Sequence, residues 1–339
     1  MRTSTQRLTI FLSATLLGAT MLASPALAWG PDGHRMIGEL AMRNLPPDLP
    51  DFMHSAEAAA LVGYLSPEPD RERGAGDSFD SDRSPAHFID VSDDMTILGG
   101  PPLSALPPSR EAFDMALRAV GSDEYKSGYL PYSIAEGFEL VAMDLAYWRI
   151  DAAGEKNTKS AQEREWFAKN RITREQIVLH DIGLWSHFVG DGSQPMHASV
   201  HYNGWGEFPN PDGFTQEHIH VPFENQYVHD NVTEDAVAAA MTRVSSCADV
   251  IMTCTAAYLA GTQQLVVPFF KLEKQGAFTK PTTQGIDFAT VQVARGASEL
   301  RNLIVDAWRD SDKKKIGYPP VAVSDYESGK ADAYDALNY

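Results

Sequence analysis

The sequence predicts a mainly α, single-domain fold in which many helices are joined by long functional loops. Apolar residues recur at helical spacing along most of the chain, and the alternation typical of strands is scarce. No internal repeat, low-complexity run or Gly/Ser-rich linker divides the chain. Three segments rich in Pro, Gly and Asp are too long for simple connections, so we expect functional loops at 66–86, 92–109 and 192–217.

The first helix is expected to begin near Asp32, because the apolar residues between Met36 and Ala41 fall on one face of a helix there. Two S/T-x-x-E/Q capping boxes, at Ser133 and Thr173, each precede a long apolar-periodic run. They predict core helices over 133–152 and 174–191. Periodic stretches predict further helices over 51–64, 110–121, 159–170, 233–259, 262–273 and 284–309.

The first 28 residues have the pattern of an export signal. Arg2 and Arg7 form a basic head, an apolar stretch follows, and Ala26-Leu27-Ala28 fits an A-x-A cleavage site. A first membrane helix is the alternative, but polar residues and a glycine interrupt the apolar stretch, and no later run approaches the ~20 apolar residues of a membrane span. We therefore predict a signal peptide at 1–28, a mature chain beginning at Trp29, and a secreted or periplasmic location.

The mature chain is expected to form one domain over 29–318, followed by a flexible C-terminal tail at 319–339 without a helical period. Loss of Arg2 and Arg7 takes the formal net charge from −18 to −20. This charge argues against a broad basic track for duplex nucleic acid, although bound metal ions can make one cleft locally positive. We expect a monomer without stable membrane insertion.

The two cysteines, Cys247 and Cys254, suit an oxidising compartment but are too few for a disulfide scaffold. On one continuous helix, residues seven apart lie roughly 10 Å from each other, beyond the ~7 Å limit for a disulfide. A bridge therefore requires a helix break between them, and the sequence leaves both arrangements open. A zinc pair is not expected, because the chain has no other thiol.

Histidines and carboxylates recur at a spacing that suits metal binding. His187 and Asp191 stand four apart in a predicted helix, so both side chains project from one face. Gly192 and Pro195 end this helix and let His197 turn back on a loop. A single pair of this kind is more often a capping or surface ion pair, so its weight depends on the other candidates.

A second pair, His220 and Glu224, repeats the four-residue spacing, and Pro222 is tolerable in the first turn of a helix there. Asp70 and His87 flank the first long loop, and each offers a ligand that zinc accepts.

Signal cleavage would expose the amine of Trp29, five residues before His34, and an α-amino group with its own carbonyl oxygen can chelate a metal ion. The alternative for Trp29 is an apolar anchor for the first helix. Nine residues thus offer nitrogen or oxygen ligands of the kinds that zinc accepts: Trp29, His34, Asp70, His87, His187, Asp191, His197, His220 and Glu224.

In their order and spacing these motifs resemble the superfamily that unites bacterial zinc-dependent phospholipase C with the single-strand-specific (S-one/P-one type) nucleases. The resemblance covers residues 29 to about 230. The matching motifs are Trp29-Gly-x-x-Gly-His34, Asp70-x-x-Arg73, His87-Phe-Ile-Asp90, His187-Phe-Val-Gly-Asp191, Gln194-Pro-Met-His197 and His220-x-x-x-Glu224.

The resemblance implies an all-helical fold with a trinuclear zinc site. Carried over residue by residue, the ligands form three sets: Asp70, His87, His187 and Asp191 for one zinc; the amine and carbonyl of Trp29, His34 and the bridging Asp191 for its neighbour; and His197, His220 and Glu224 for the third.

Phosphodiester hydrolysis is the reaction that such a site implies. Paired zinc ions lower the pKa of a water towards ~7, and a third can stabilise the leaving oxygen. Asp70 is expected to orient or deprotonate the nucleophile, and Arg73 to bind a nonbridging phosphoryl oxygen. Three zinc ions outweigh three ligand carboxylates, so an anionic substrate is admissible in the cleft.

For a nuclease, the resemblance implies that Phe88 stacks on a base and that Asp90 bonds to the edge of the base. Base stacking of ~1–3 kcal/mol favours unpaired strands, whose faces are free. Core packing is the alternative for Phe88. The lead hypothesis is therefore a secreted zinc endonuclease acting on single-stranded DNA and RNA, with 3′-nucleotides as further substrates.

Features of the phospholipase branch also occur. The short Trp29-to-His34 spacing and the 23 positions from His197 to His220 resemble the nucleases. Glu224, where nucleases usually carry Asp, resembles the phospholipase, and the Gly-Gly-Asn stretch that nucleases place after Gln-Pro-x-His is missing. A phospholipase C acting on phospholipid head groups is the runner-up. A periplasmic zinc-binding protein without turnover is the hypothesis from a different class.

Overall fold

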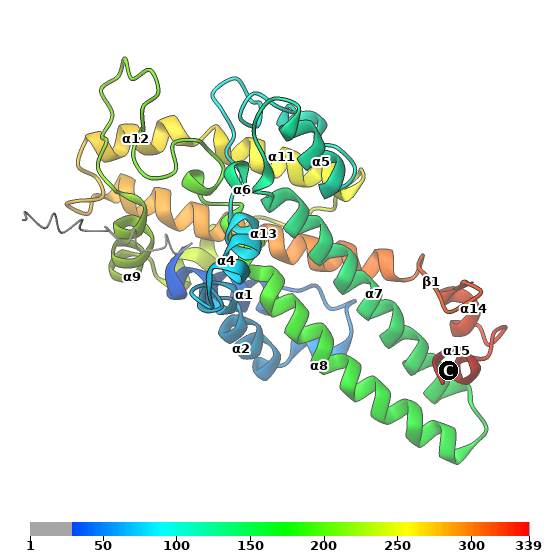
Figure 1. Ribbon diagram of the computed structural model, residues 1–339. Coiled ribbons are helices and arrows are strands. Elements are labelled where there is room, and N and C mark those ends of the chain that lie inside the picture. The colour runs from blue at the N-terminus through cyan, green and yellow to red at the C-terminus, as the bar shows by residue number, and fades with distance from the viewer. Residues whose placement is uncertain (1–28, 339) are drawn as a thin grey trace, which may run out of the picture.

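Helices make up nearly all of the regular structure in residues 29–338, the part of the chain that this computed structural model describes. The predicted mainly α, single-domain fold is confirmed. Four helices pack on one another at its centre: α1 (Gly30–Arg43), α7 (Leu130–Asn157), α8 (Ala161–Asp191) and α13 (Thr283–Ser311). Figure 1 shows α7 and α8 as a long hairpin, one end of which reaches beyond the other helices.

Shorter elements surround these four helices. Eight precede α7: η1 (Asp51–His54), α2 (Ala56–Leu65), α3 (Glu68–Arg71), α4 (Asp77–Arg83), η2 (Ser84–His87), η3 (Leu103–Ala105), α5 (Arg110–Arg118) and, directly before α7, α6 (Glu124–Ser127). Those after α8 are η4 (Pro195–His197), η5 (Pro222–Tyr227), α9 (Val228–Asn231), α10 (Glu234–Ala240), α11 (Ile251–Gln263) and α12 (Val266–Lys274).

Both expected capping boxes lie inside helices, so the predicted starts of the two core helices were wrong. α7 begins three residues before Ser133, whose hydroxyl instead donates to the main-chain oxygen of Ala86 at 3.1 Å. Thr173 lies in the middle of α8, and its hydroxyl bonds back to the oxygen of Lys169 at 3.1 Å. The helices expected over 159–170 and 174–191 are therefore one continuous helix.

Glycine lets α7 and α8 approach closely near the cluster of histidines. A Cβ on Gly137 would overlap the indole of Trp185, which lies directly over it. Trp185 is buried and donates from Nε1 to the oxygen of Ile134 at 2.8 Å. The indole thus occupies the space that any larger residue at position 137 would need, and this contact fixes the end of α8 that carries the candidate ligands.

The segment from Pro319, expected to be a flexible tail, instead forms regular structure up to residue 338. An antiparallel pair, β1 (Lys315–Ile316) and β2 (Val321–Ala322), leads into α14 (Val323–Glu327) and α15 (Ala333–Leu337). Buried side chains of this segment form a second apolar core with the C-terminal half of α7 and the N-terminal half of α8. Its buried members are Ala146, Ile150, Phe167, Ile316, Val323, Tyr326 and Ala333.

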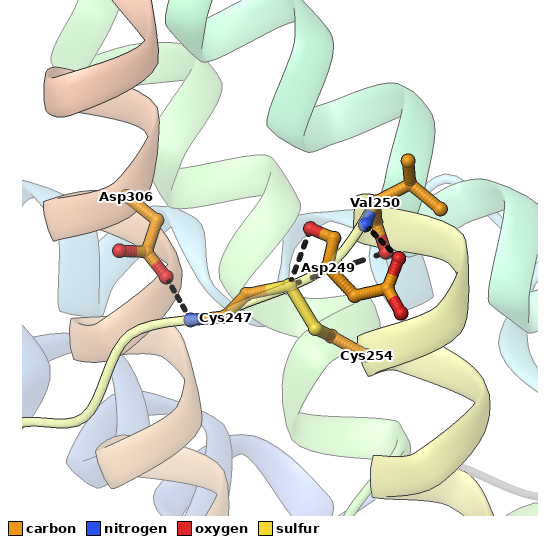
Figure 2. The surroundings of a disulfide bond; sticks show 5 residues. All are labelled: Cys247, Asp249, Val250, Cys254 and Asp306. Atoms are coloured by element: carbon orange, nitrogen blue, oxygen red, sulfur yellow. Dashed lines mark hydrogen bonds between the residues drawn. A yellow bond between two sulfur atoms is a disulfide. The ribbon is translucent and has the colours of Figure 1, made fainter.

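The helix expected over 233–259 is interrupted between α10 and α11, and the irregular stretch contains Cys247. The break satisfies the condition for a bridge, and a disulfide joins Cys247 to Cys254, with their Cα atoms 6.0 Å apart. Figure 2 shows the main-chain nitrogen of Cys247 donating to Asp306 of α13, at 2.7 Å. Ser298 and Asn302, two turns and one turn earlier in α13, accept from the nitrogens of Thr242 and Ser245.

Two observations bear on the cell compartment. Within residues 29–338, every helix is too short or too polar to cross a membrane. The disulfide suits an oxidising compartment. The predicted signal peptide at 1–28 lies outside the described residues.

Candidate metal centre

Eight of the nine predicted ligands come together in three groups, although they are spread from position 34 to position 224. Within each group the candidate ligand atoms lie within 4.8 Å of one another. We call the eight together the His/carboxylate cluster. The groups are His34, His187 and Asp191; Asp70, His87 and His187; and His197, His220 and Glu224.

Asp191 lies at the centre of the cluster, in the last turn of α8. Its Oδ1 is 3.4 Å from His34 Nε2, and its Oδ2 is 3.3 Å from His87 Nδ1 and 3.4 Å from His187 Nε2. The expectation that His187 and Asp191 project from one face of a helix is therefore confirmed. A carboxylate with imidazoles on both oxygens has the geometry of a bridging ligand.

The Asp191 carboxylate is fully buried, and neither oxygen accepts a hydrogen bond from any group in residues 29–338. Burial away from water raises the pKa of Asp191 well above its ordinary value. A buried carboxylate without hydrogen bonds is costly unless a positive charge compensates it. The donor set is therefore one that a cation would complete.

The imidazole of His34 likewise lacks hydrogen-bond partners within residues 29–338. Its ring is fully buried, and neither ring nitrogen has a hydrogen-bond partner in the described part of the chain. It stacks on the ring of His187 with centroids 3.9 Å apart, so burial and the adjacent His187 lower its pKa well below the ordinary value. The neutral ring presents a lone pair to Asp191, and this is the form that binds metal ions.

Main-chain oxygens orient three further histidines. Nδ1 of His187 lies 2.9 Å from the oxygen of Ser66, and Nδ1 of His197 lies 2.6 Å from the oxygen of His87. Nδ1 of His220 lies 2.6 Å from the oxygen of Tyr202. Because a carbonyl oxygen can only accept, each ring donates from Nδ1 and turns the Nε2 lone pair into the cluster. Such outer contacts are typical of histidines that bind metals.

The third group brings acceptors together in the same way. Nε2 of His220 lies 3.1 Å from Nε2 of His197 and 2.7 Å from Glu224 Oε1. Burial opposes ionisation of Glu224, but the neighbouring His220 and His197 outweigh it and lower its pKa to about 2. A carboxylate and two nitrogen lone pairs thus converge on one point, which a cation would occupy favourably.

The local backbone explains why His220 meets Glu224. Glu224 lies in η5, a π-helical turn, and His220 lies two residues before this turn begins, so the expected helix is present in a wider form. Turns of this kind are frequent at functional sites. Gln194 adds a contact that the sequence did not reveal, because its amide lies 3.2 Å from His220 Nε2 and also donates to Glu224.

Asp70 and Arg73 approach the cluster from α3 and the turn that follows it. Asp70 Oδ1 lies 3.8 Å from both His87 Nδ1 and His187 Nε2, and 3.3 Å from Arg73 Nη1. Burial raises the pKa of Asp70, and the charges of His34 and Arg73 act against this rise. The guanidinium therefore stands at the edge of the cluster with its charge beside the shared carboxylate.

Trp29 is buried, and its indole Nε1 donates to the oxygen of Gly190 and to Ser193 Oγ, both at 2.9 Å. It therefore anchors the start of α1 on the end of α8, next to Asp191. The cleavage that would free its amine falls on residues outside the described part, so the chelating role stays a prediction. On the other side of the same helix end, Tyr258 and Thr262 of α11 donate to Val189 and Gly192.

A cleft of about 310 Å³ opens onto one side of the cluster. Its wall includes Phe88, which is partly exposed, so the alternative of complete burial in the core does not hold. Asp90 is buried in this wall, where burial raises its pKa well above the ordinary value. The residues around the cleft are Arg73, His87, Phe88, Asp90, Lys126, Met196, His197, Tyr202 and His220.

Two other histidines lie outside the cluster. His201 is fully buried against the ring of Trp205. His180 is largely exposed beside Asp181. Helical spacing could not show the burial of His201, because this residue lies in an irregular loop.

No protein-family model matches the chain, and no curated protein matches it significantly.

Proposed function

We propose that this protein is a secreted, zinc-dependent phosphodiesterase of the superfamily it resembles. We propose further that it is an endonuclease acting on single-stranded DNA and RNA, with 3′-nucleotides as additional substrates. The observation that carries the proposal is the cleft, which combines cluster ligands with an arginine, an aromatic ring and a buried carboxyl group. The steps below use only the residues around it.

The His/carboxylate cluster fits zinc by its chemistry. Its donors are imidazole nitrogens and carboxylate oxygens, both common ligands of this ion, and several of them are buried without hydrogen bonds. The three groups would hold three ions, with the amine and carbonyl of Trp29 completing the set around His34 and Asp191. The ions would supply Lewis acidity and positive charge close to the scissile bond.

Arg73 is suited to bind the phosphoryl group. It lines the cleft, its side chain is 14% exposed, and it stands 3.3 Å from Asp70. A guanidinium can hold a nonbridging phosphoryl oxygen through charge-assisted hydrogen bonds. Asp70 keeps the guanidinium in place and can accept a proton from the attacking water, because burial raises the pKa of this carboxyl.

Two other residues of the cleft wall, Phe88 and Asp90, are suited to a base. The partly exposed ring of Phe88 offers a stacking face, and its backbone is held by the nitrogen of Leu130 at 3.0 Å. A Cβ on Gly128 would overlap the main-chain oxygen of Phe88, so this close contact requires glycine. Asp90 Oδ1 has no hydrogen-bond partner in residues 29–338 and is free to bond to the edge of a base.

The first experiment compares substrates. The purified mature protein with zinc is assayed on a single-stranded oligonucleotide, the matching duplex and phosphatidylcholine. We expect cleavage of the single strand to be fastest. Cleavage of phosphatidylcholine alone would reject the nuclease proposal.

The second experiment tests Arg73. Arg73→Ala should lower kcat/KM for the oligonucleotide by about a hundredfold, as expected for loss of a group that binds the transition state. The matched control is Arg71→Ala, at the end of the short helix that precedes Arg73, because Arg71 is exposed and pairs with Glu68 at 2.7 Å away from the cleft. Equal rates for both variants and the wild type would remove Arg73 from the mechanism.

A phospholipase C is the second candidate. Glu224 favours it, as does the 199–217 segment that stands in place of the nuclease Gly-Gly-Asn stretch. Tyr202 and Phe208 of this segment are 55% and 41% exposed, which would suit contact with a lipid surface. Diacylglycerol release from phosphatidylcholine would support this candidate. If the zinc-loaded protein hydrolyses neither substrate, the hypothesis that remains is a zinc-binding protein without turnover.

A further inference from the structure

Two of the long loops meet at a His–Asp pair outside the His/carboxylate cluster. His201 comes from the 192–217 loop and is fully buried. Its Nε2 lies 3.0 Å from Oδ1 of Asp93 in the 92–109 loop, and its Nδ1 lies 2.7 Å from the main-chain oxygen of Trp205. Neither His201 nor Asp93 is a candidate ligand, and the proposed mechanism uses neither.

Trp205 makes this contact rigid. Its ring stacks on His201 with centroids 3.7 Å apart and an interplanar angle of 16°. Its Nε1 donates to the oxygen of Pro209 at 2.9 Å, and its main-chain nitrogen donates to Thr215 at 2.8 Å. Phe214 and Phe270 enclose the other sides of the indole. The loop is therefore packed around His201, and it does not merely touch it.

Both ring nitrogens of His201 face oxygen atoms, the main-chain oxygen of Trp205 on one side and Oδ1 of Asp93 on the other. The ring is therefore held in one orientation between the two loops, and the pair is a specific link between them.

Residues beside this pair line the cleft. Asp90 precedes Asp93 by three residues, Tyr202 directly follows His201, and both line the cleft. A hydrogen bond of 3.1 Å from the nitrogen of Val200 to the oxygen of Val91 joins the segments between them. The main-chain oxygen of Tyr202 accepts from His220 at 2.6 Å, so the link also reaches a candidate ligand.

We propose that His201 and Asp93 form a clasp that sets the position of Tyr202 relative to Asp90, and thereby the affinity of the cleft for a nucleotide. The inference rests on the proposed function, because it concerns the substrate of that site. His201 and Asp93 are positioning residues in this account, since they act on substrate only through Tyr202 and Asp90.

The test uses Asp93, whose side chain is 59% exposed and can be changed without opening the core. Asp93→Ala removes the acceptor and should raise KM for a single-stranded oligonucleotide about tenfold, the effect of a lost charge-assisted hydrogen bond. The value of kcat should stay within about twofold. Asp93→Asn keeps an acceptor oxygen and should restore most of the affinity.

The matched control is a second His–Asp pair, His229 with Asp32, in which both side chains lie at the surface, 66% and 45% exposed. His229→Gln should leave KM and kcat unchanged. The clasp would be refuted if Asp93→Ala had the KM of the wild type, or if kcat fell while KM did not change.

A second measurement separates this inference from the proposed function. Amide hydrogen exchange of the zinc-loaded protein is followed without substrate in Asp93→Ala and the wild type. Faster exchange over residues 199–206 in the variant is expected, because the loop loses its link. Equal exchange rates would refute the clasp, even if no nucleic acid substrate were cleaved by the wild type.

Discussion

Asp191 Oδ1 lies 3.4 Å from His34 Nε2, and neither side chain makes a hydrogen bond to any group in residues 29–338. The two residues come from α8 and α1, which pack against each other. Burying an ionisable pair in this way is unfavourable without a further charge. The relationship predicts that the metal-free and metal-loaded proteins respond in opposite ways to one substitution.

Asp191→Asn is that substitution. In the metal-free protein it removes a buried, unpaired carboxylate, so unfolding should become about 1–3 kcal/mol less favourable. In the zinc-loaded protein it removes a carboxylate that would hold zinc, so the stabilisation by zinc should fall. Thermal unfolding with a chelator and with excess zinc measures both. Loss of stability in the presence of the chelator would contradict this account of Asp191.

Tyr258→Phe tests the support of the helix end that carries Asp191. The hydroxyl of Tyr258 donates to the oxygen of Val189 at 2.9 Å and is buried. Its loss should destabilise the protein by about 1 kcal/mol and weaken zinc binding. Tyr227→Phe is the control, because the buried hydroxyl of Tyr227 has no hydrogen-bond partner within residues 29–338. Equal zinc affinity in the two variants would show that Tyr258 does not position Asp191.

The buried carboxyl group of Asp151 should make the free energy of unfolding depend on pH. It is buried in α7, and burial raises its pKa to about 7, against the opposing charges of Arg174 and Arg171. The folded chain therefore holds a proton on Asp151 up to about pH 7, whereas the unfolded chain releases it near pH 4. The free energy of unfolding should fall as pH rises through this window, by up to about 4 kcal/mol.

Asp151→Asn should abolish that part of the pH dependence, because the amide has no proton to lose. Urea unfolding of variant and wild type between pH 4 and pH 8 measures the difference. The variant should be the more stable of the two at pH 8. Parallel curves across the whole range would show that Asp151 does not cause the effect.

The disulfide between Cys247 and Cys254 joins two parts of the chain. It links the irregular stretch that runs along α13 to the first turn of α11. It closes a short loop, so its removal should cost about 2 kcal/mol of stability by the loss of chain constraint. Cys247→Ser with Cys254→Ser is compared with the wild type in urea. Zinc content should not change, because the bridge lies away from the His/carboxylate cluster. A loss of zinc in the double variant would contradict this separation.

The sequence predicted the fold class, because helical periodicity depends on local spacing, and it singled out eight residues that the structure brings together in three groups. The i,i+4 relationship of His187 and Asp191 follows from helix geometry alone. The predicted helix starts at Ser133 and Thr173 were wrong because α7 and α8 both begin earlier in the chain, where packing against each other and against other helices stabilises them. A capping box is a local preference, and packing along a long hairpin outweighs it.

What the sequence could not show depends on contacts between distant residues. The segment from Pro319 lacks a helical period, yet Val323 and Tyr326 are buried against α7 and α8. His201 and Asp93 are 108 positions apart, and no spacing rule connects them. Such pairs become visible only when the loops are seen side by side.

The number of zinc ions per chain tests the central claim most directly. Elemental analysis would be made on protein that begins at Trp29 and on a version that retains Ala28, in which the amine is an amide. The account predicts three ions in the first protein and a loss at the His34 and Asp191 position in the second. At most one ion per chain in the protein that begins at Trp29 would contradict it.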